Sequence, residues 1–157
     1  MKLNIGITEK NLQAVANELQ KLLADEVVLY MKTRNYHWNI EGPSFMELHK
    51  LYEGQYEMLD DIMDSVAERI RQLGHHAEGQ LKDFVQLTRL GEDGYSSNAK
   101  EQLKNLLEDH ETIARNLRKN IIEFSDDYHD AGTADFVTGL LKEHEKTAWF
   151  IRSYTKE

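Results

Sequence analysis

The feature that most restricts the fold is a long helical pattern that runs from Ser44 to Leu73. Apolar residues recur in it at intervals of three and four, as on a helix face that packs against a core. They are Phe45, Leu48, Tyr52, Tyr56, Leu59, Ile62, Met63, Val66, Ile70 and Leu73. Ser44 and Glu47 have the spacing of a capping box, and Gly74 occupies the position of a C′ glycine. The pattern predicts one long amphipathic helix.

The same helix carries two pairs of polar residues spaced four apart, His49/Glu53 and Asp64/Glu68. At about 100° per residue, Glu53, Asp60, Asp64 and Glu68 lie about 20–100° to one side of His49, and the apolar stripe lies to the other side. Histidine nitrogen together with carboxylate oxygen suits iron and its neighbours in the transition series. A solvated acidic face of a long surface helix is the competing interpretation.

Distance decides how such a metal site is assembled. His49 and Asp64 are separated by roughly 22 Å along the helix axis, whereas metal–ligand bonds are about 2 Å long. A second copy of the helix, antiparallel about a two-fold axis near Leu59, places His49 and Glu53 of one chain opposite Asp64 and Glu68 of the other. A two-fold contact repeats itself, so it creates two equivalent sites. We therefore predict metal sites split across a homodimer interface.

Four segments of sequence resemble the Dps miniferritins, and the resemblance covers nearly the whole chain. They are Asn35-Tyr36-His37-Trp38-Asn39 followed by Gly42-Pro43 and His49, the Asp64-x-x-x-Glu68-Arg69 run ending at Gly74, and the segments 132–135 and 143–149. The resemblance adds His37 as a further ligand. The chain departs from the family pattern at Glu53, where the family commonly has Asp, so the extra methylene shifts that carboxylate.

The resemblance implies a dodecameric shell built from dimers, with ferroxidase sites at the dimer interfaces. Family members bind Fe²⁺, oxidise it with hydrogen peroxide in preference to dioxygen, and store the ferric product. On that basis His37, His49, Asp64 and Glu68 are the expected catalytic residues, and Glu53 joins them as a metal ligand. In larger ferritins the di-iron ligands include Glu-x-x-His pairs within one bundle. This sequence contains no Glu-x-x-His, which argues against a site of that kind.

The rest of the sequence predicts one all-α domain over residues 1–157. Periodic segments at about 8–38, 44–73, 98–124 and 130–154 predict four long helices, and residues 83–87 predict a short helix in the long connection between the second and third. This order matches a ferritin-like four-helix bundle. His110 and His144 fall on apolar stripes and are expected to be buried, each with one hydrogen bond.

A cluster of acids precedes and begins the fourth helix. Asp130 has the position of an N-cap, and helix N-termini favour nearby negative charge. The resemblance implies a three-fold pore at this turn, where Asp126, Asp130 and Asp135 would draw in ferrous ions. Capping and solvation remain the alternative roles.

Composition limits the possible partners and location. The chain has no cysteine, a short polar start and no run approaching a membrane span, so a cytoplasmic protein is expected. Its net charge of −9, with only Lys2 before Thr8 and only Lys156 among the last three residues, predicts no tight DNA binding. A nucleoid-binding shell, and a shell that buffers zinc or manganese without turnover, remain the alternative functions.

Overall fold

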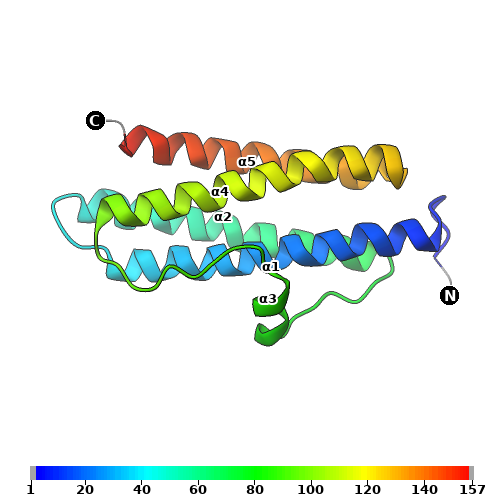
Figure 1. Ribbon diagram of the computed structural model, residues 1–157, viewed down its shortest axis with the longest axis horizontal. Coiled ribbons are helices and arrows are strands. Elements are labelled where there is room, and N and C mark those ends of the chain that lie inside the picture. The colour runs from blue at the N-terminus through cyan, green and yellow to red at the C-terminus, as the bar shows by residue number, and fades with distance from the viewer. Residues whose placement is uncertain (1–2, 156–157) are drawn as a thin grey trace.

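The computed structural model describes residues 3–155, and these form helices joined by loops, without strands. The elements are α1 (Glu9–Asn39), α2 (Phe45–Gln72), α3 (Leu81–Leu87), α4 (Ala99–Ile122), the π-helical turn η1 (Glu123–Asp127) and α5 (Ala131–Thr155). Figure 1 shows α1 and α2 as one antiparallel pair, packed against the pair α4 and α5. The connection that contains α3 runs along the outside of α1 from one end of the bundle to the other. The predicted four-helix bundle with a short extra helix is confirmed.

Local sequence explains most of the helix ends. The Thr8 hydroxyl accepts a hydrogen bond from the Asn11 amide, and the Asn98 side chain accepts one from the Glu101 amide. Gly74 has a φ of 85°, the left-handed conformation that glycine adopts without strain at a C′ position. The predicted capping box of α2 is wrong, because Ser44 has a ψ of 21° instead of the extended conformation and its side chain makes no capping bond.

Apolar residues from all four long helices meet in one core. Of the ten stripe residues predicted on α2, seven are buried and Tyr56 and Met63 are partly buried. Phe45 is the exception, because it is 39% exposed at the start of the helix. None of the helices in residues 3–155 is long and apolar enough to cross a membrane.

Buried charges fasten the long connection to α1. Asp25, which is fully buried, accepts hydrogen bonds from the Thr88 hydroxyl and from the Arg89 amide and guanidinium, at 2.6–2.9 Å. Further along the connection, Lys32 Nζ forms ion pairs with Asp93 and with Asp109 of α4, at 2.5 and 2.6 Å. Because these pairs lie at two points along α1, they fix the path that the connection takes across the bundle.

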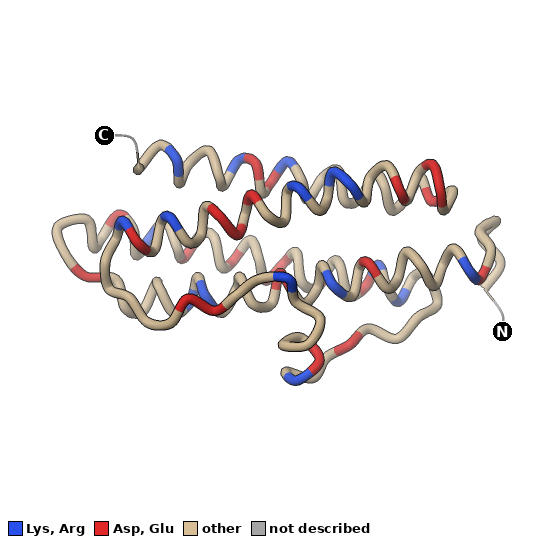
Figure 2. The backbone as a smooth tube through the Cα atoms, viewed as in Figure 1, with Lys and Arg blue, Asp and Glu red and all other residues tan. Residues whose placement is uncertain are grey.

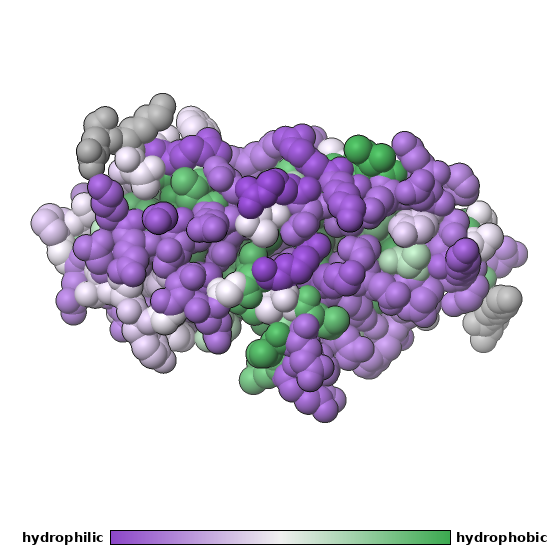
Figure 3. Space-filling view, in the orientation of Figure 1, coloured by the Kyte–Doolittle hydropathy of each residue, from purple (hydrophilic) through white to green (hydrophobic). Residues whose placement is uncertain are grey.

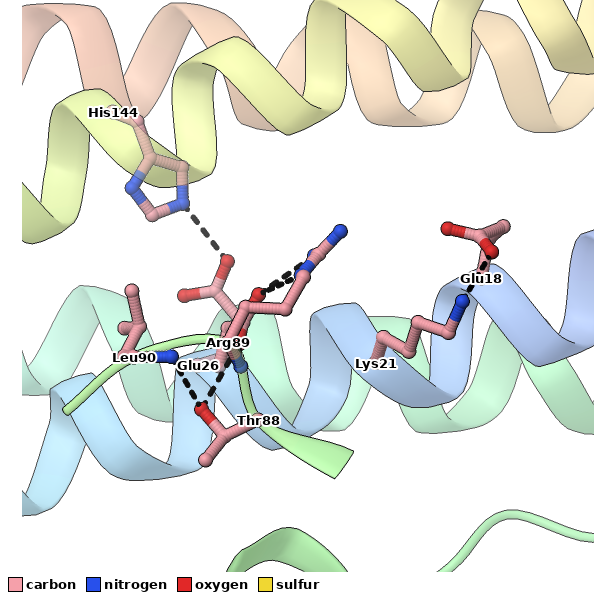
Figure 4. Close-up of polar contacts among 8 residues, drawn as sticks. Glu18, Lys21, Glu26, Thr88, Arg89, Leu90 and His144 are labelled. Atoms are coloured by element: carbon pink, nitrogen blue, oxygen red, sulfur yellow. Dashed lines mark hydrogen bonds and ion pairs between the residues drawn. The ribbon is translucent and has the colours of Figure 1, made fainter. Parts of the chain in front are cut away.

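A second polar group lies inside the bundle itself. His144 of α5 bonds through Nε2 to the Glu26 carboxylate of α1 (Figure 4) and through Nδ1 to His110 Nδ1 of α4, both at 2.9 Å. All three side chains are fully buried, and burial lowers the pKa of His110 well below its ordinary value. The two histidines are buried as predicted, but His144 makes two hydrogen bonds instead of one.

Asp109 gives the fold a measurable pH dependence. Burial raises the pKa of Asp109 to about 6. The Lys32 charge opposes this shift, but Lys32 also pairs with Asp93. The folded chain therefore holds this proton more tightly than the unfolded chain, and the stability it contributes is lost as pH rises from about 4 through about 6. The Asp109→Asn side chain has no proton to lose, so its melting temperature should rise relative to that of the parent as the pH increases from 4 to 7. Over the full window this corresponds to about 3 kcal/mol in the free energy of unfolding.

The control is Glu57→Gln, which removes an exposed carboxylate from α2, away from Asp109. Thermal unfolding followed by circular dichroism across this pH range measures both variants. A melting-temperature difference between Asp109→Asn and the parent that stays constant with pH contradicts the assignment.

Candidate metal centre

The α1–α2 hairpin brings two of the predicted ligands together. His37 lies in the last turn of α1 and His49 in the second turn of α2, so the short connection between the helices places them side by side. Their rings stack with centroids 3.8 Å apart and an interplanar angle of 20°. His37 is buried and His49 is partly buried.

Reciprocal hydrogen bonds fix the direction of both rings. His37 Nδ1 lies 2.8 Å from the His49 carbonyl oxygen, and His49 Nδ1 lies 2.9 Å from the His37 carbonyl oxygen. A carbonyl oxygen only accepts hydrogen bonds, so each Nδ1 carries the proton and donates it. In the neutral imidazole the lone pair then resides on Nε2, the atom that binds a metal. The hairpin thus orients two nitrogen donors through its own hydrogen bonds.

Glu53 lies one turn beyond His49 on α2 and is engaged by a lysine. Its carboxylate forms an ion pair with Lys50 Nζ at 2.7 Å. The hydrogen bond and charge of Lys50 lower the pKa of Glu53, with smaller contributions from His37 and His49. In return, Glu53 raises the pKa of Lys50. The carboxylate is therefore kept ionised beside the histidine pair, and Lys50 competes for it with any cation.

Asp64 and Glu68 lie near the other end of α2, and both are exposed. Within residues 3–155 no three histidine or acidic side chains converge closely enough to hold a metal ion. Midway between the two polar pairs, Leu59 is fully buried in the core of its own chain. Asp60 and Asp61 are the exposed positions at that level.

The surface beside Asp64 has a shape that suits a protein contact. A hollow of about 430 Å³ lies among α1, α2 and α3, with lining residues that include Val27, Asp64 and Phe84. Next to it, α3 projects from the bundle and displays Leu81 and Val85, which are 77% and 71% exposed. Figure 3 shows apolar residues gathered over this projecting helix. An acidic hollow and an apolar projection thus occur on the same side of the chain.

The acids at the turn into α5 occupy two different environments. Asp130 is buried and accepts hydrogen bonds from the Thr133 amide at 2.9 Å and the Thr133 hydroxyl at 2.5 Å, with Arg69 Nη2 at 3.4 Å. It therefore caps α5. Asp126 and Asp135 are exposed, as is the neighbouring Asp127, so these three acids at the turn face solvent.

Sequence reasoning missed the aromatic group that surrounds Arg34. The Arg34 guanidinium carbon lies 4.2 Å from the ring centroid of Tyr56, 5.5 Å from that of Tyr30 and 5.6 Å from the Trp38 ring. The available signal was the i, i+4, i+8 spacing of Tyr30, Arg34 and Trp38, which puts the three residues on one face of α1.

Comparison with known proteins shows which family the chain resembles. The ferritin-like domain family matches residues 16–157 of the chain. An uncharacterised low temperature-induced protein from Nostoc sp. is 44% identical over 154 residues, which cover 98% of this chain and 86% of that protein. A DNA protection during starvation protein from Helicobacter pylori is 34% identical over 137 residues, which cover 87% of this chain and 94% of its own.

Solved structures agree with these relatives. The crystal structure of a Dps protein from Vibrio cholerae O1 has a TM-score of 0.93 at 30% identity, covering 99% of this chain and 98% of that one. That protein is described as a member of a broad superfamily of ferritin-like diiron-carboxylate proteins.

Lys50 provides a direct test of whether Glu53 belongs to the metal centre. Since Lys50 neutralises the Glu53 carboxylate, Lys50→Gln should tighten the binding of a divalent probe such as Co²⁺ by about threefold, the size typical of an exposed ion pair. Anaerobic titration followed by visible absorbance measures the affinity. Lys104→Gln, on an exposed position of α4, makes the same substitution far along the chain and serves as the control. Equal affinities for Lys50→Gln and the parent remove Glu53 from the site.

Proposed function

This chain is a Dps miniferritin of the ferritin-like superfamily, and we propose that it oxidises ferrous iron at sites completed by two chains. Iron storage and protection against stress are general to this family, which forms dodecameric homo-oligomers. Our proposal for this chain is more specific. It names His37 and His49 as nitrogen donors from one chain, and Asp64 and Glu68 as oxygen donors from a second copy.

The reciprocal hydrogen bonds of the two histidines are the observation that carries the proposal. They orient the two Nε2 lone pairs, and Lys50 lowers the pKa of Glu53 and so keeps its carboxylate ionised nearby. Two imidazoles and carboxylate oxygens form a donor set that suits ferrous iron, and also its neighbours in the transition series. The residues present therefore fit the substrate.

Exposure and distance support the need for a second chain. Asp64 and Glu68 lie on the exposed side of α2, and even the nearer one, Asp64, is roughly 22 Å from His49 along the helix axis. An antiparallel copy of α2 brings them opposite the histidine pair, and a two-fold axis then creates two equivalent sites. The acidic hollow and the projecting α3 lie on the same side of the chain, where they would contribute to that contact.

The proposed reaction uses ferrous iron as the substrate and hydrogen peroxide as the oxidant. Two ferrous ions each lose one electron, and one peroxide with two protons becomes two molecules of water. Because both electrons reach the same peroxide, the O–O bond breaks without releasing hydroxyl radical. The residues of this chain bind and orient the ions at the interface, and the ferric product hydrolyses and collects inside the shell.

The remaining parts of the proposal concern partners. We propose that the shell acts in the cytoplasm and does not bind DNA tightly, because each chain carries a net charge of −9. Figure 2 shows acidic and basic positions interspersed along the helices of the described chain. The terminal lysines Lys2 and Lys156, on which that prediction also depends, lie outside the described residues.

Removing the two oxygen donors tests the site. Asp64→Ala combined with Glu68→Ala should slow ferrous oxidation by peroxide by about 100-fold or more, since loss of even the outer partners of a metal ligand costs 10–100-fold. The near-ultraviolet absorbance of the ferric product in stopped flow measures the rate, and size-exclusion chromatography confirms assembly. Glu92→Ala with Glu108→Ala removes the same charge from exposed positions elsewhere.

If the Asp64→Ala/Glu68→Ala variant assembles normally and still oxidises iron at the parent rate, the assignment is refuted. Binding of zinc or manganese by the parent protein, without any ferric product after addition of iron and peroxide, would instead favour a divalent-ion buffer.

The exposed acids at the turn into α5 generate a second test. Asp126→Asn with Asp135→Asn should slow iron uptake at low ionic strength by about tenfold, because electrostatic steering of cations is lost. The difference from the parent should shrink in concentrated salt, which screens such steering. Uptake is followed by mineral absorbance at limiting iron, with Glu92→Gln and Glu108→Gln as the control pair. A salt-independent rate difference, or none at all, contradicts a pore role.

A further inference from the structure

We propose that Tyr56 and Arg34 are positioning residues that hold the His37 imidazole in the orientation required of a metal ligand. The inference deepens the proposed function and rests on the ferrous site described above. Neither residue supplies a donor atom to that site in this proposal. Each acts through its neighbour, Arg34 on Tyr56 and Tyr56 on His37.

The first observation is a continuous stack of rings across the hairpin. Phe45 stacks on His49 at 5.0 Å and 28°, and His49 stacks on His37 at 3.8 Å and 20°. At the other end, Tyr56 meets His37 edge-to-face, with centroids 5.2 Å apart and an angle of 83°. The two ligand rings therefore lie between Phe45 on one side and Tyr56 on the other. Aromatic pairs favour both of these geometries.

The second observation is how Tyr56 is itself held. The Arg34 guanidinium lies over its ring at 4.2 Å, and Tyr30 packs against it edge-to-face at 6.2 Å and 81°. Among residues 3–155, no carboxylate lies within ion-pair distance of Arg34, so its contacts are with aromatic faces. The geometry identifies Arg34 as the clamp on one side of Tyr56, and His37 as the ring in contact with it.

A positioning role is needed because hydrogen bonds restrain His37 incompletely. The bond from Nδ1 to the His49 carbonyl fixes one ring atom, but the ring can still tilt about that contact. Contact with His49 on one side and Tyr56 on the other limits this tilt and so fixes the direction of Nε2. A ligand already held in its bound orientation loses less conformational freedom when the metal arrives.

A purely electrostatic effect of Arg34 would change the metal affinity in the opposite direction from a positioning role. A guanidinium close to a metal site repels the incoming cation, so charge alone predicts that Arg34→Met tightens Co²⁺ binding. Positioning predicts that the same substitution weakens it, because Tyr56 loses its clamp. Outer partners of metal ligands typically change metal affinity by 10–100-fold. We therefore expect weakening of about tenfold for both Arg34→Met and Tyr56→Leu.

The experiment is an anaerobic Co²⁺ titration of the assembled protein, with affinity and the visible ligand-field spectrum as readouts. Tyr56→Phe keeps the ring and should retain parental affinity within about twofold. A site that is sensitive to any change in packing would instead lose affinity in Tyr56→Phe as it does in Tyr56→Leu. The double variant Arg34→Met/Tyr56→Leu should bind no more weakly than Tyr56→Leu alone, since both changes act on one contact. Arg115→Met and Tyr95→Leu are matched controls at positions on α4 and in the exposed connection.

Three results would overturn the inference: tighter binding by Arg34→Met, unchanged affinity and spectrum in Tyr56→Leu, or additive losses in the double variant. Each of these results can be distinguished from failure of the proposed ferrous site itself. In that case Asp64→Ala/Glu68→Ala would bind Co²⁺ like the parent, whatever Tyr56 and Arg34 do.

Discussion

The two hydrogen bonds that join His37 and His49 through each other's carbonyl oxygens are the constraint on which the proposed site depends. They link the end of one helix to the start of the next, so they stabilise the hairpin and select the histidine tautomers together. Both Nδ1 atoms donate their protons to carbonyl oxygens, which leaves Nε2 on each ring with the lone pair that can bind a metal. The fold and the chemistry of the site thus share the same two contacts.

Away from this hairpin, polar groups in the interior specify how the bundle is connected. Asp25 and Lys32 bind the crossing segment to α1 through Arg89 and Asp93, and Lys32 also pairs with Asp109 of α4. Ion pairs of this kind add little net stability when compared with well-packed apolar residues, but breaking one leaves an uncompensated charge. Their role here is to fix one path for a long connection, and thereby to place α3 beside the acidic hollow.

Periodicity and helix-end chemistry were enough to predict the helices, because those signals act within a few residues. Thr8, Asn98 and Gly74 end or begin helices where expected. The errors came where a neighbour outside the local window decides the outcome. Ser44 does not cap because the hairpin turn sets its backbone, and Phe45 leaves the core because it stacks on His49. Glu26 as the partner of His144 lies 118 residues away in the chain and left no local signal.

The sequence alone determined that the chain is a helical bundle and that one α2 helix cannot gather His49, Glu53, Asp64 and Glu68 around one ion. Helix rise and rotation per residue are fixed by the backbone, so spacing translates directly into distance and direction. Only the tertiary structure decided which nitrogen of each histidine is free, that Lys50 engages Glu53, and that Arg34 and Tyr56 lie beside His37. These depend on side-chain directions and on contacts between helices, which no single helix encodes.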